Sequence, residues 1–502
     1  MGCIPSSPKK IGPKKNLTSR NISIKPANFM RMSQSFNYSD YLEIKKLGSG
    51  AFAEVLLCLH KPTKTQRALK LIRKSGLDNS QKDSEFLLKE FLILRSLDHP
   101  SILKCFEIFE NDLFYYVATE YCPAGDLFSE IVKLKKFTER QAANIMYQLL
   151  SVLIYCHDKN VIHRDLKPEN ILLMENGNEL SIKVADFGNS TIFDPDCRLS
   201  GCFGSAYYIA PEVFIDSYNE KCDIWSAGII LYILLTGIPP YQGRDNKSIL
   251  EKVKHRPFKI TSGNSAGLSQ DAINFLKRLL QLNMSLRFSA KESVGHPWIT
   301  NNLEKKAADI EVALSNLKNF NCQSKLKSAV HVYIASQITS YDELKYFKNC
   351  FQQIDKNGDG KITREELIAE YSKQMPVEEA EKVSEEIILK LDKDEDGNIE
   401  YTEFLVSCME RQKQVSLSNL EAAFNVFDLD GNGTITVDEI KLILNSGEVE
   451  DEATWKEILR EADTNGDGVI DLREFLHLMS STLHTVNTAK LLKSITNDCK
   501  FK

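Results

Sequence analysis

His163-Arg164-Asp165-Leu166-Lys167-Pro168-Glu169-Asn170 and, sixteen residues after Asn170, Asp186-Phe187-Gly188 are the two motifs around which the chain is organised. A carboxylate, a lysine and an amide within one short stretch, followed by a second carboxylate, suit phosphoryl transfer. Asp165 would accept the proton of a substrate hydroxyl, and Lys167 would neutralise charge on the moving phosphoryl group. Asn170 and Asp186 would hold magnesium on the nucleotide phosphates. Two linked motifs in this order argue against a chance His-Arg-Asp in a loop.

These motifs resemble those of eukaryotic protein kinases, and the Asp-Leu-Lys-Pro-Glu-Asn form resembles the serine/threonine branch. The resemblance implies a bilobal α+β fold over residues 41–299, with ATP as co-substrate and Mg2+ as cofactor. Lys70 would contact the phosphates, and Glu90 in the helical run 84–97 would form an ion pair with it, Glu85 being the nearest competing glutamate. The residues expected to bind ATP are Leu47, Gly48, Ser49, Gly50, Ala51, Phe52, Ala53, Glu54, Val55, Lys70, Glu120 and Cys122.

Other positions extend this resemblance and show one departure from it. Ala53 replaces the third glycine of the phosphate-covering loop, which is the departure from the family pattern. Asp126, Glu130 and Glu169 stand where related kinases recognise basic residues before the phosphorylated hydroxyl. We therefore expect protein substrates with basic residues near the Ser or Thr, although each acid could be an ordinary surface residue.

Two further positions are expected to have structural roles in the catalytic domain. The activation segment runs from Asp186 to Glu212, and Ser205 stands where many related kinases have threonine. Asp223 would brace the catalytic loop from the following helix. Arg287 would pair with a buried Glu212.

Composition and charge describe a chain of two or three domains. The 502 residues are 42% hydrophobic and 26% charged, which is ordinary for a globular protein. Residues 1–40 hold seven basic side chains against one acid, whereas residues 341–480 hold fifteen against thirty-four. The twelve cysteines are scattered without metal-ligand spacing, so reduced thiols are expected. A basic arm therefore precedes an acidic, cation-binding module, and no nucleic-acid partner is expected.

The first residues fit an acylation pattern. Gly2 would be exposed for myristoylation after removal of Met1, with Ser6 at the required position, and Cys3 is a natural palmitoylation site. A second acyl chain, or the neighbouring lysines at an anionic leaflet, would hold the chain on a membrane surface. The alternative is a disordered N-terminus that happens to begin Met-Gly. Residues 1–40 are accordingly expected to be a flexible arm, on the cytosolic face of a membrane.

An internal repeat fills residues 341–480, with loops at 355–366, 392–403, 428–439 and 463–474. Each loop has oxygen-bearing side chains at positions 1, 3 and 5, glycine at 6, a backbone carbonyl at 7 and glutamate at 12, as calcium requires. Isoleucine at position 8 would pair the first loop with the second and the third with the fourth. Some sites could instead hold magnesium or stay filled as structure. The second loop carries the most negative charge and is predicted to bind calcium most tightly. The expected calcium ligands are Asp355, Asn357, Asp359, Lys361 and Glu366; Asp392, Asp394, Asp396, Asn398 and Glu403; Asp428, Asp430, Asn432, Thr434 and Glu439; and Asp463, Asn465, Asp467, Val469 and Glu474.

Residues 300–340 form a junction between the two parts. Leu314, Leu317 and Phe320 have helical spacing, and after a break the pattern resumes from Leu326 to Ile338, with Lys325 and Lys327 between the two stretches. Such a basic amphipathic helix could block a basophilic cleft, and its apolar face could also dock in a calcium-sensor groove. A packing helix without a switching role is the alternative.

The order of the parts resembles the calcium-dependent protein kinases, which carry their own calmodulin-like domain. The resemblance runs from Gly2 to about residue 480, leaving 481–502 as a tail without recognisable chemistry. It implies a monomer that the junction inhibits at low calcium and that calcium on the EF-hands releases. Two other hypotheses remain. The chain could be a catalytically dead calcium-binding scaffold, although Lys70, Asp165 and Asp186 are all present, or a constitutively active kinase whose EF-hands serve localisation or folding.

Overall fold

The computed structural model describes most of the chain between its two ends. The expectations at Gly2, Cys3, Gly50, Ala51, Phe52 and Asp394 lie outside the described residues. The described residues are 24–33, 38–49, 53–76, 84–175, 180–201, 203–255, 257–260, 267–303, 310–320, 324–392, 396–408, 417–444 and 452–480.

The strands belong to one large sheet and several two-stranded ladders. The large sheet has the order β1-β5-β6-β4-β3-β2. The strands are β1 (Arg31–Ser33), β2 (Tyr41–Ser49), β3 (Ala53–His60), β4 (Thr65–Arg73), β5 (Cys105–Glu110), β6 (Phe114–Glu120), β7 (Val161–Ile162), β8 (Ile171–Leu173), β9 (Ile182–Val184), β10 (Thr191–Ile192), β11 (Ile362–Thr363), β12 (Asn398–Ile399), β13 (Thr434–Ile435) and β14 (Ile470–Asp471).

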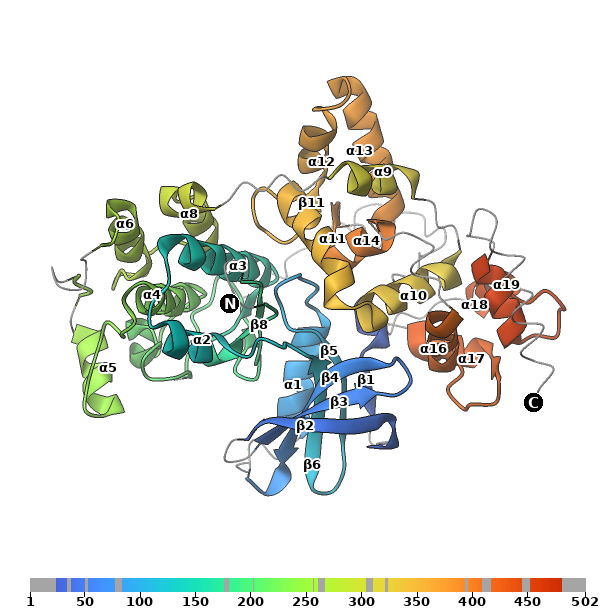
Figure 1. Ribbon diagram of the computed structural model, residues 1–502, viewed down its shortest axis with the longest axis horizontal. Helices are drawn as coiled ribbons and strands as arrows, with labels where there is room; N and C mark the ends of the chain where they lie inside the picture. Colours follow the sequence, from blue (N-terminus) through green and yellow to red (C-terminus); the bar gives the residue numbers. More distant parts are fainter. Residues whose placement is uncertain are drawn as a thin grey trace, which may run out of the picture.

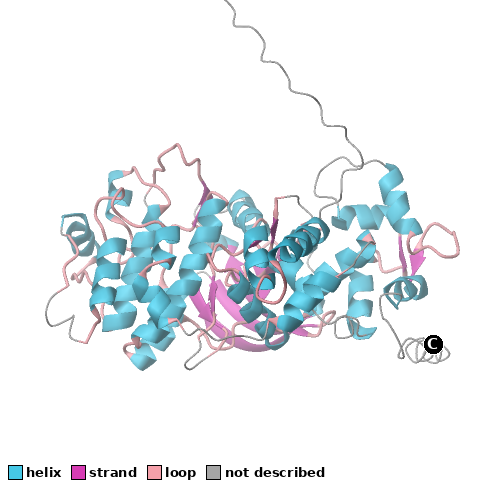
Figure 2. Ribbon diagram, turned by 90° about the horizontal axis from the view of Figure 1, so that it is seen from above, coloured by secondary structure: helices cyan, strands magenta, loops and turns pink. Residues whose placement is uncertain are grey.

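Helices make up the rest of the regular structure (Figure 2). Over the described residues, no helix combines the length and the apolar character needed to cross a membrane. The α-helices are α1 (Ser84–Arg95), α2 (Leu127–Leu134), α3 (Glu139–Asp158), α4 (Lys221–Thr236), α5 (Asn246–His255), α6 (Gln270–Leu279), α7 (Ala290–Val294), α8 (Pro297–Asn302), α9 (Glu311–Asn319), α10 (Lys325–Tyr333), α11 (Tyr341–Ile354), α12 (Arg364–Tyr371), α13 (Val377–Leu391), α14 (Tyr401–Cys408), α16 (Leu417–Phe427), α17 (Val437–Leu444), α18 (Glu452–Arg460) and α19 (Leu472–Ser480). The 3-10 helices are η1 (Pro26–Phe29), η2 (Tyr38–Asp40), η3 (Lys74–Gly76), η4 (Pro168–Asn170) and η5 (Pro211–Ile215), and η6 (Ile334–Ile338) is a π-helix.

The large sheet and α1 form the N-terminal lobe of the catalytic domain (Figure 1). Strands β2 to β6 pair antiparallel, while β1 joins β5 in parallel. On β4, Lys70 lies opposite Val55 of β3 and Val117 of β6. The sheet therefore places Lys70 between the glycine-rich strands and the strand that leads into the hinge.

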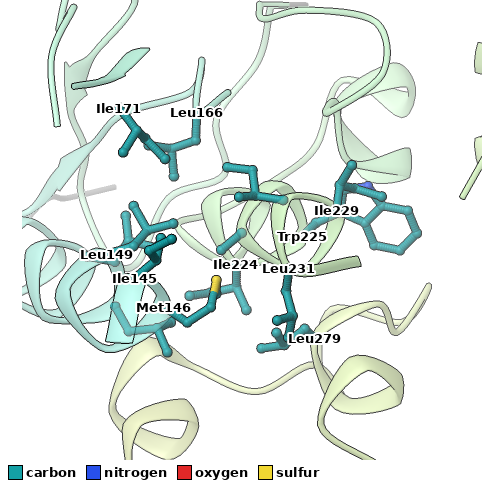
Figure 3. Packing of buried hydrophobic residues seen from close by; sticks show 14 of the residues in the cluster. Ile145, Met146, Leu149, Leu166, Ile171, Ile224, Trp225, Ile229, Leu231 and Leu279 are labelled. Atoms are coloured by element: carbon teal, nitrogen blue, oxygen red, sulfur yellow. The ribbon is translucent and has the colours of Figure 1, made fainter. Parts of the chain in front are cut away.

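The C-terminal lobe is built around α3 and α4. Thr138 and Gln141 form a capping box that starts α3, and α4 is apolar on all sides, as a helix buried on every face must be. Leu166 and Ile171, which lie in and just after the catalytic loop, pack in the same core as Leu149 of α3 and Trp225 of α4 (Figure 3). The core thus fixes the catalytic loop at its middle and just after its last residue.

The junction and the EF-hand helices share a second core. Helices α9 and α10 form where the apolar spacing predicted them, and α10 continues into the π-helix η6. Leu314, Leu317, Leu326 and Val330 are all buried among the EF-hand helices. In Figure 1, α10 lies between the first EF-hand pair (α11 to α14) and the second (α16 to α19). The predicted fold class is confirmed: a bilobal α+β kinase fold followed by an all-α calmodulin-like domain with two EF-hand pairs.

Short ladders join the calcium-binding loops in pairs. Ile362 pairs with Ile399 between β11 and β12, and Ile435 pairs with Ile470 between β13 and β14. The sequence-based prediction that the position-8 isoleucines link loops one with two and three with four is confirmed.

The N-terminal arm differs in part from the expected flexible spacer. Residues 26–29 form η1 and residues 31–33 form β1, with Ile24 and Phe29 each about nineteen-twentieths buried. Ile24 and Phe29 belong to the EF-hand core, whereas β1 belongs to the kinase sheet. The polar composition suggested a spacer. The apolar side chains of Ile24 and Phe29, just before β1, nevertheless anchor this short segment.

Candidate active site and metal-binding loops

Asp223 of α4 holds the catalytic loop in place. The backbone N–H groups of His163 and Arg164 donate to its two carboxylate oxygens, each at 2.9 Å. Burial opposes ionisation of Asp223, but a hydrogen bond and the charge of His157 outweigh it and hold its pKa below the usual value. Arg164 has a φ of 66°, a conformation that this anchoring stabilises. Asp223 therefore braces the loop, as the family resemblance implied.

Asp165, Lys167 and Asn170 come together on this braced loop. Lys167 Nζ lies 2.7 Å from Asp165 Oδ2, and Asn170 Nδ2 donates to the Asp165 carbonyl at 2.9 Å. Ser205 of the activation segment donates to Asp165 Oδ1 from both its N–H and its hydroxyl, at 3.1 Å each. Lys167 also donates to the Ser205 hydroxyl at 3.2 Å. The catalytic loop and the activation segment are thus both bound to the Asp165 carboxylate.

Asp186 stands next to this group with a φ of 63°. The following residue, Phe187, is fully buried, with its ring 4.8 Å from the ring of His163. Burial opposes ionisation of Asp186, but the positive charges of Lys70, His163 and Lys167 outweigh it and lower its pKa. Asp186 is consequently an ionised carboxylate at neutral pH, as a metal ligand must be.

The expected ion pair between Lys70 and Glu90 is not closed. Among the described residues, no Lys70–Glu90 contact falls within the 4 Å of an ion pair. Burial raises the pKa of Glu90 to about 7, although the charge of Lys70 and a hydrogen bond from the Phe187 N–H both act to lower it. Lys70 and Glu90 therefore face the same buried region without direct contact.

The nucleotide-binding elements lie on either side of Lys70. Gly48 and Ser49 of β2 pair with Val55 and Glu54 of β3, which forms the two arms of the predicted glycine-rich turn. The Glu120 carboxylate at the hinge accepts from the Lys104 N–H at 2.7 Å and forms an ion pair with Lys183 at 2.8 Å. The Glu120 N–H also donates within the protein, to the Lys104 carbonyl at 3.0 Å, so the Glu120 carbonyl is the part left for a nucleotide. Leu47 lies on β2 with its side chain partly exposed. Ala53 is the first residue of β3, and Cys122, which follows the hinge, is buried.

The activation segment is anchored by contacts that the sequence did not reveal. The Arg164 guanidinium donates to the Asn189 carbonyl at 2.6 Å and to the Tyr218 hydroxyl at 3.3 Å. The same group lies over the ring of Phe203, 4.0 Å from its centroid. Asn189 in turn donates to Asp165 Oδ2 at 3.4 Å. Local motifs could not predict these contacts, because the partners are 24 to 54 residues apart.

The four calcium-binding loops share one backbone turn. In each, the glycine at position 6 has a φ between 78° and 86° and donates its N–H to the aspartate at position 1. The glutamate at position 12 connects the ends of the first loop, where Glu366 accepts from the N–H groups of Lys356 and Thr363 at 2.9 and 3.0 Å. Glu439 and Glu474 do the same in the third and fourth loops. The turn that calcium coordination requires is therefore already formed.

Among the residues that the structure describes, carboxylates gather most closely in the second EF-hand pair. The ligand atoms of Asp428, Asp430 and Glu439 lie within 4.8 Å of one another, as do those of Asp463, Asp467 and Glu474. In the first loop, burial and the neighbouring Asp359 and Glu366 hold the pKa of Asp355 well above its usual value. These oxygen sets fit a hard divalent cation, whose charge would relieve their mutual repulsion. The predicted tightest site, the second loop, includes Asp394 outside the described residues, so its rank stays a prediction.

The first EF-hand pair lies directly on the kinase domain. Asp98 accepts hydrogen bonds from the N–H and hydroxyl of Thr402 at 2.9 and 3.0 Å, and Lys159 pairs with Glu400 at 2.8 Å. A Cβ placed on Gly360 of the first loop would collide with the ring of His99 and come within 3.2 Å of Tyr155.

The buried lysine of α11 lies at the same interface. Lys348 Nζ is 2.6 Å from the Ser181 hydroxyl of the kinase domain. Periodicity marks the helices that meet here but not which faces meet, so the sequence did not predict this interface.

The fold and the sites together define a protein kinase joined to two EF-hand pairs, and comparison with known sequences agrees. A family model described as protein kinase domain matches residues 41–299, and an EF-hand domain pair model matches residues 344–407 and 417–480.

Individual relatives narrow the class. The chain is 37% identical over 475 residues to calcium-dependent protein kinase 4 of Plasmodium berghei (strain Anka), an alignment that covers 91% of this chain and 90% of the relative. It is 38% identical to calcium-dependent protein kinase 4 of Plasmodium falciparum (isolate 3D7) with the same coverage. It is also 38% identical to calcium-dependent protein kinase 5 of that species, over 88% of this chain and 78% of the relative. The chain belongs to the calcium-dependent protein kinase family, whose members are serine/threonine kinases using ATP with Mg2+ and responding to Ca2+.

Proposed function

We propose that residues 300–340 inhibit the kinase domain at low calcium and release it when calcium fills the four loops. The observation that supports this proposal is the location of the junction, whose apolar residues are buried in the EF-hand core. A helix that buries its apolar face there cannot use that face to cover the kinase cleft at the same time. In this proposal, the described arrangement is taken as the released form. At low calcium, Lys325 and Lys327 would direct the same helix to the substrate cleft, beside the exposed Glu169.

The energy available from calcium matches the work of such a switch. Moving an equilibrium from 1:99 to 99:1 takes about 5.5 kcal/mol of differential binding. A site filled only in the released form, at calcium ten times its dissociation constant, contributes about 1.4 kcal/mol, so four contribute roughly 5.7 kcal/mol. All four loops are therefore needed, and the loss of one should raise the calcium requirement.

The catalytic residues act on substrate and nucleotide as their geometry suggests. Asp165 would accept the proton of the substrate Ser or Thr hydroxyl, and Lys167, 2.7 Å from Asp165 Oδ2, would approach the transferred phosphoryl group. Lys70 would hold the ATP phosphates beneath the glycine-rich turn, and Glu90, in the same buried region, would pair with it only after α1 moves closer.

Asn170 and Asp186 fit the magnesium expected in this site. Asn170 uses its Nδ2 on the Asp165 carbonyl, which directs Oδ1 elsewhere, and Asp186 is kept ionised. Mg2+, when bound, neutralises charge on the ATP phosphates. Two oxygen donors beside the phosphates suit its preference for carboxylate, phosphate and water ligands.

We further propose a preference for substrates with basic residues near the Ser or Thr. Glu169 is exposed beside the catalytic loop, where it can meet a basic side chain. Asp126, by contrast, caps α2 by accepting from the Ser129 N–H at 2.7 Å, and Glu130 pairs with Lys133 at 3.1 Å. Glu169 is therefore the acid to replace first when basic and neutral peptides are compared.

The N-terminal arm is proposed to attach the kinase to the cytosolic face of a membrane. Support comes from the sequence, in which Gly2 and Cys3 precede a cluster of lysines. Each acyl chain alone binds reversibly, and two together anchor stably. Incorporation of labelled fatty acids into the chain and into Gly2→Ala and Cys3→Ser variants tests this, and scattering in solution tests the expected monomer.

The central experiment measures phosphate transfer from Mg-ATP to a basic serine peptide, first in chelator and then across a calcium titration. Wild-type protein should be active only with calcium. Val330→Asp, which places a charge where α10 is buried, should blunt activation, whereas Val312→Asp on the exposed side of α9 should not. Equal wild-type activity in chelator and in calcium would reject the junction switch.

A further inference from the structure

Residues 24–33, called the N-terminal strap below, hold the EF-hand core on one side. Phe29 packs its ring 5.3 Å from that of Tyr333 on α10 and 6.1 Å from that of Phe427 on α16. Ile24 is buried in the same core. Asn28 Nδ2 donates to the carbonyl of Leu444, the last residue of α17, at 3.1 Å. The strap therefore contacts both the junction helix and the second EF-hand pair.

The other side of the N-terminal strap holds the N-terminal lobe. Met30, the residue after Phe29, packs against the cluster that contains Phe91 of α1. Arg95 at the end of α1 donates from Nε to the Ala27 carbonyl at 2.9 Å. Beyond Met30, β1 extends the kinase sheet in parallel with β5. The adjacent side chains of Phe29 and Met30 thus enter two different cores, the EF-hand core and the core of the N-terminal lobe. The packing of Met30 against the cluster of Phe91 and the hydrogen bond between Ala27 and Arg95 join the strap to α1.

The connection to α1 matters because α1 carries Glu90. The position of this helix decides whether Glu90 can reach Lys70, and the two are not in direct contact here. The strap can hold α1 and the EF-hand core together only while the two bodies keep this relative placement. If the EF-hand core and the N-terminal lobe separate, the strap must lose its contacts with one of them. The other contacts within each core are kept.

We infer that the N-terminal strap is a positioning segment through which the calcium-loaded EF-hand core restrains α1, the helix that carries Glu90. This inference rests on the proposed function, because it assigns a second output to the same calcium switch. Calcium then acts twice: it removes the junction from the cleft, and it provides the surface to which Phe29 and Ile24 bind. The partner of that surface is a segment of this chain.

The expected size of the effect follows from the burial of Phe29. Truncation of a buried phenylalanine to alanine weakens its packing by at least about 100-fold in an equilibrium constant. Shared over four cooperative calcium sites, a factor of 100 raises the half-activating calcium by its fourth root, about three-fold.

The test uses the full-length protein with Phe29→Ala, Met30→Ala and the double variant. Leu442→Ala, on an exposed side of α17 in the same EF-hand pair, is the matched control. Each single variant should raise the half-activating calcium, by about three-fold for Phe29→Ala, and the control should not. If the strap is a single link, the double variant should show no more than the larger single effect, because cutting either side breaks the connection. Additive effects, or an unchanged calcium requirement, would overturn the inference.

Hydrogen exchange separates this inference from the junction switch. With calcium, Phe29→Ala should increase exchange of the α1 and β5 amides, although Phe29 itself packs in the other body. If the wild type proves active in chelator, the junction switch fails, yet this exchange result would still support the strap. Unchanged α1 and β5 exchange would reject the strap even if activation by calcium is normal.

Discussion

Replacement of Lys348 by methionine should make the kinase more sensitive to calcium. Lys348 lies fully buried where α11 meets the kinase domain, 2.6 Å from the Ser181 hydroxyl and 3.5 Å from Gln148 Oε1. Burial lowers its pKa to about 7, and the like charge of Lys183 adds to this, although Glu120 and Glu175 act in the opposite direction. A protonated Lys348 must lose its proton or bury its charge when the EF-hand domain docks on the kinase domain. The residue therefore opposes docking at any pH at which the undocked lysine is protonated.

The sign and size of the effect follow from the two pKa values. An undocked lysine has a pKa of about 10.5, so docking releases a proton between pH 7 and 10.5 and strengthens as pH rises through that window. From pH 7 to 8.5 the gain is about 1.6 kcal/mol, or roughly 16-fold, because the docked lysine is already half-deprotonated at pH 7. Shared over four calcium sites, it lowers the half-activating calcium about two-fold. Below pH 7 this group contributes no further pH dependence.

The assay is peptide phosphorylation against free calcium at pH 7 and at pH 8.5. The wild type should need about half as much calcium at the higher pH. Lys348→Met should need less calcium than the wild type at pH 7, because an apolar side chain of similar length avoids the cost of burying a charge. It should also lose most of the pH response, whereas Lys345→Met, at a partly exposed ion pair with Glu175, should keep it. A Lys348→Met enzyme that needs more calcium, or that keeps the wild-type pH response, would refute this reasoning.

Three further expectations concern catalysis, calcium and stability. Asp165→Asn should lower kcat by about 100-fold or more with little change in the melting temperature, because the amide keeps the shape but not the basicity; turnover and thermal unfolding measured together check it. Glu403→Gln should raise the calcium needed for activation, and an unchanged titration would remove the second loop from the switch. Arg287→Ala should destabilise the kinase domain by about 3–5 kcal/mol, because it leaves the Glu212 carboxylate buried without its partner. Denaturant unfolding would measure the last effect, with Lys291→Ala at an exposed ion pair as the control.

The sequence predicted the features that are set by residues close together in the chain, such as loops and helices. The pairing of Ile362 with Ile399 follows from loop spacing alone, and the junction helices follow from apolar periodicity. The bracing of the catalytic loop by Asp223 came instead from family resemblance, and the geometry bears it out.

The sequence did not predict what depends on the relative placement of large bodies. Lys348 resembles any surface lysine of an amphipathic helix until Ser181, 167 residues away, is known to face it. Residues 24–33 are polar enough to indicate a spacer, and only the two cores around them give Phe29 and Met30 their partners. The open distance between Lys70 and Glu90 likewise reflects where α1 lies, which no motif encodes.

The four EF-hand loops have nearly the same motif, yet they are not interchangeable modules. Gly397, Gly433 and Gly468 need only their backbone conformation, since a Cβ at any of them would meet nothing within 4 Å. Gly360 needs in addition the space that the ring of His99 leaves to it. Replacement of Gly360 by any residue with a Cβ would keep the calcium ligands but lose the fit to the kinase. The first loop therefore evolves under the constraints of two domains, and drift in the kinase surface around His99 must be matched within a calcium site.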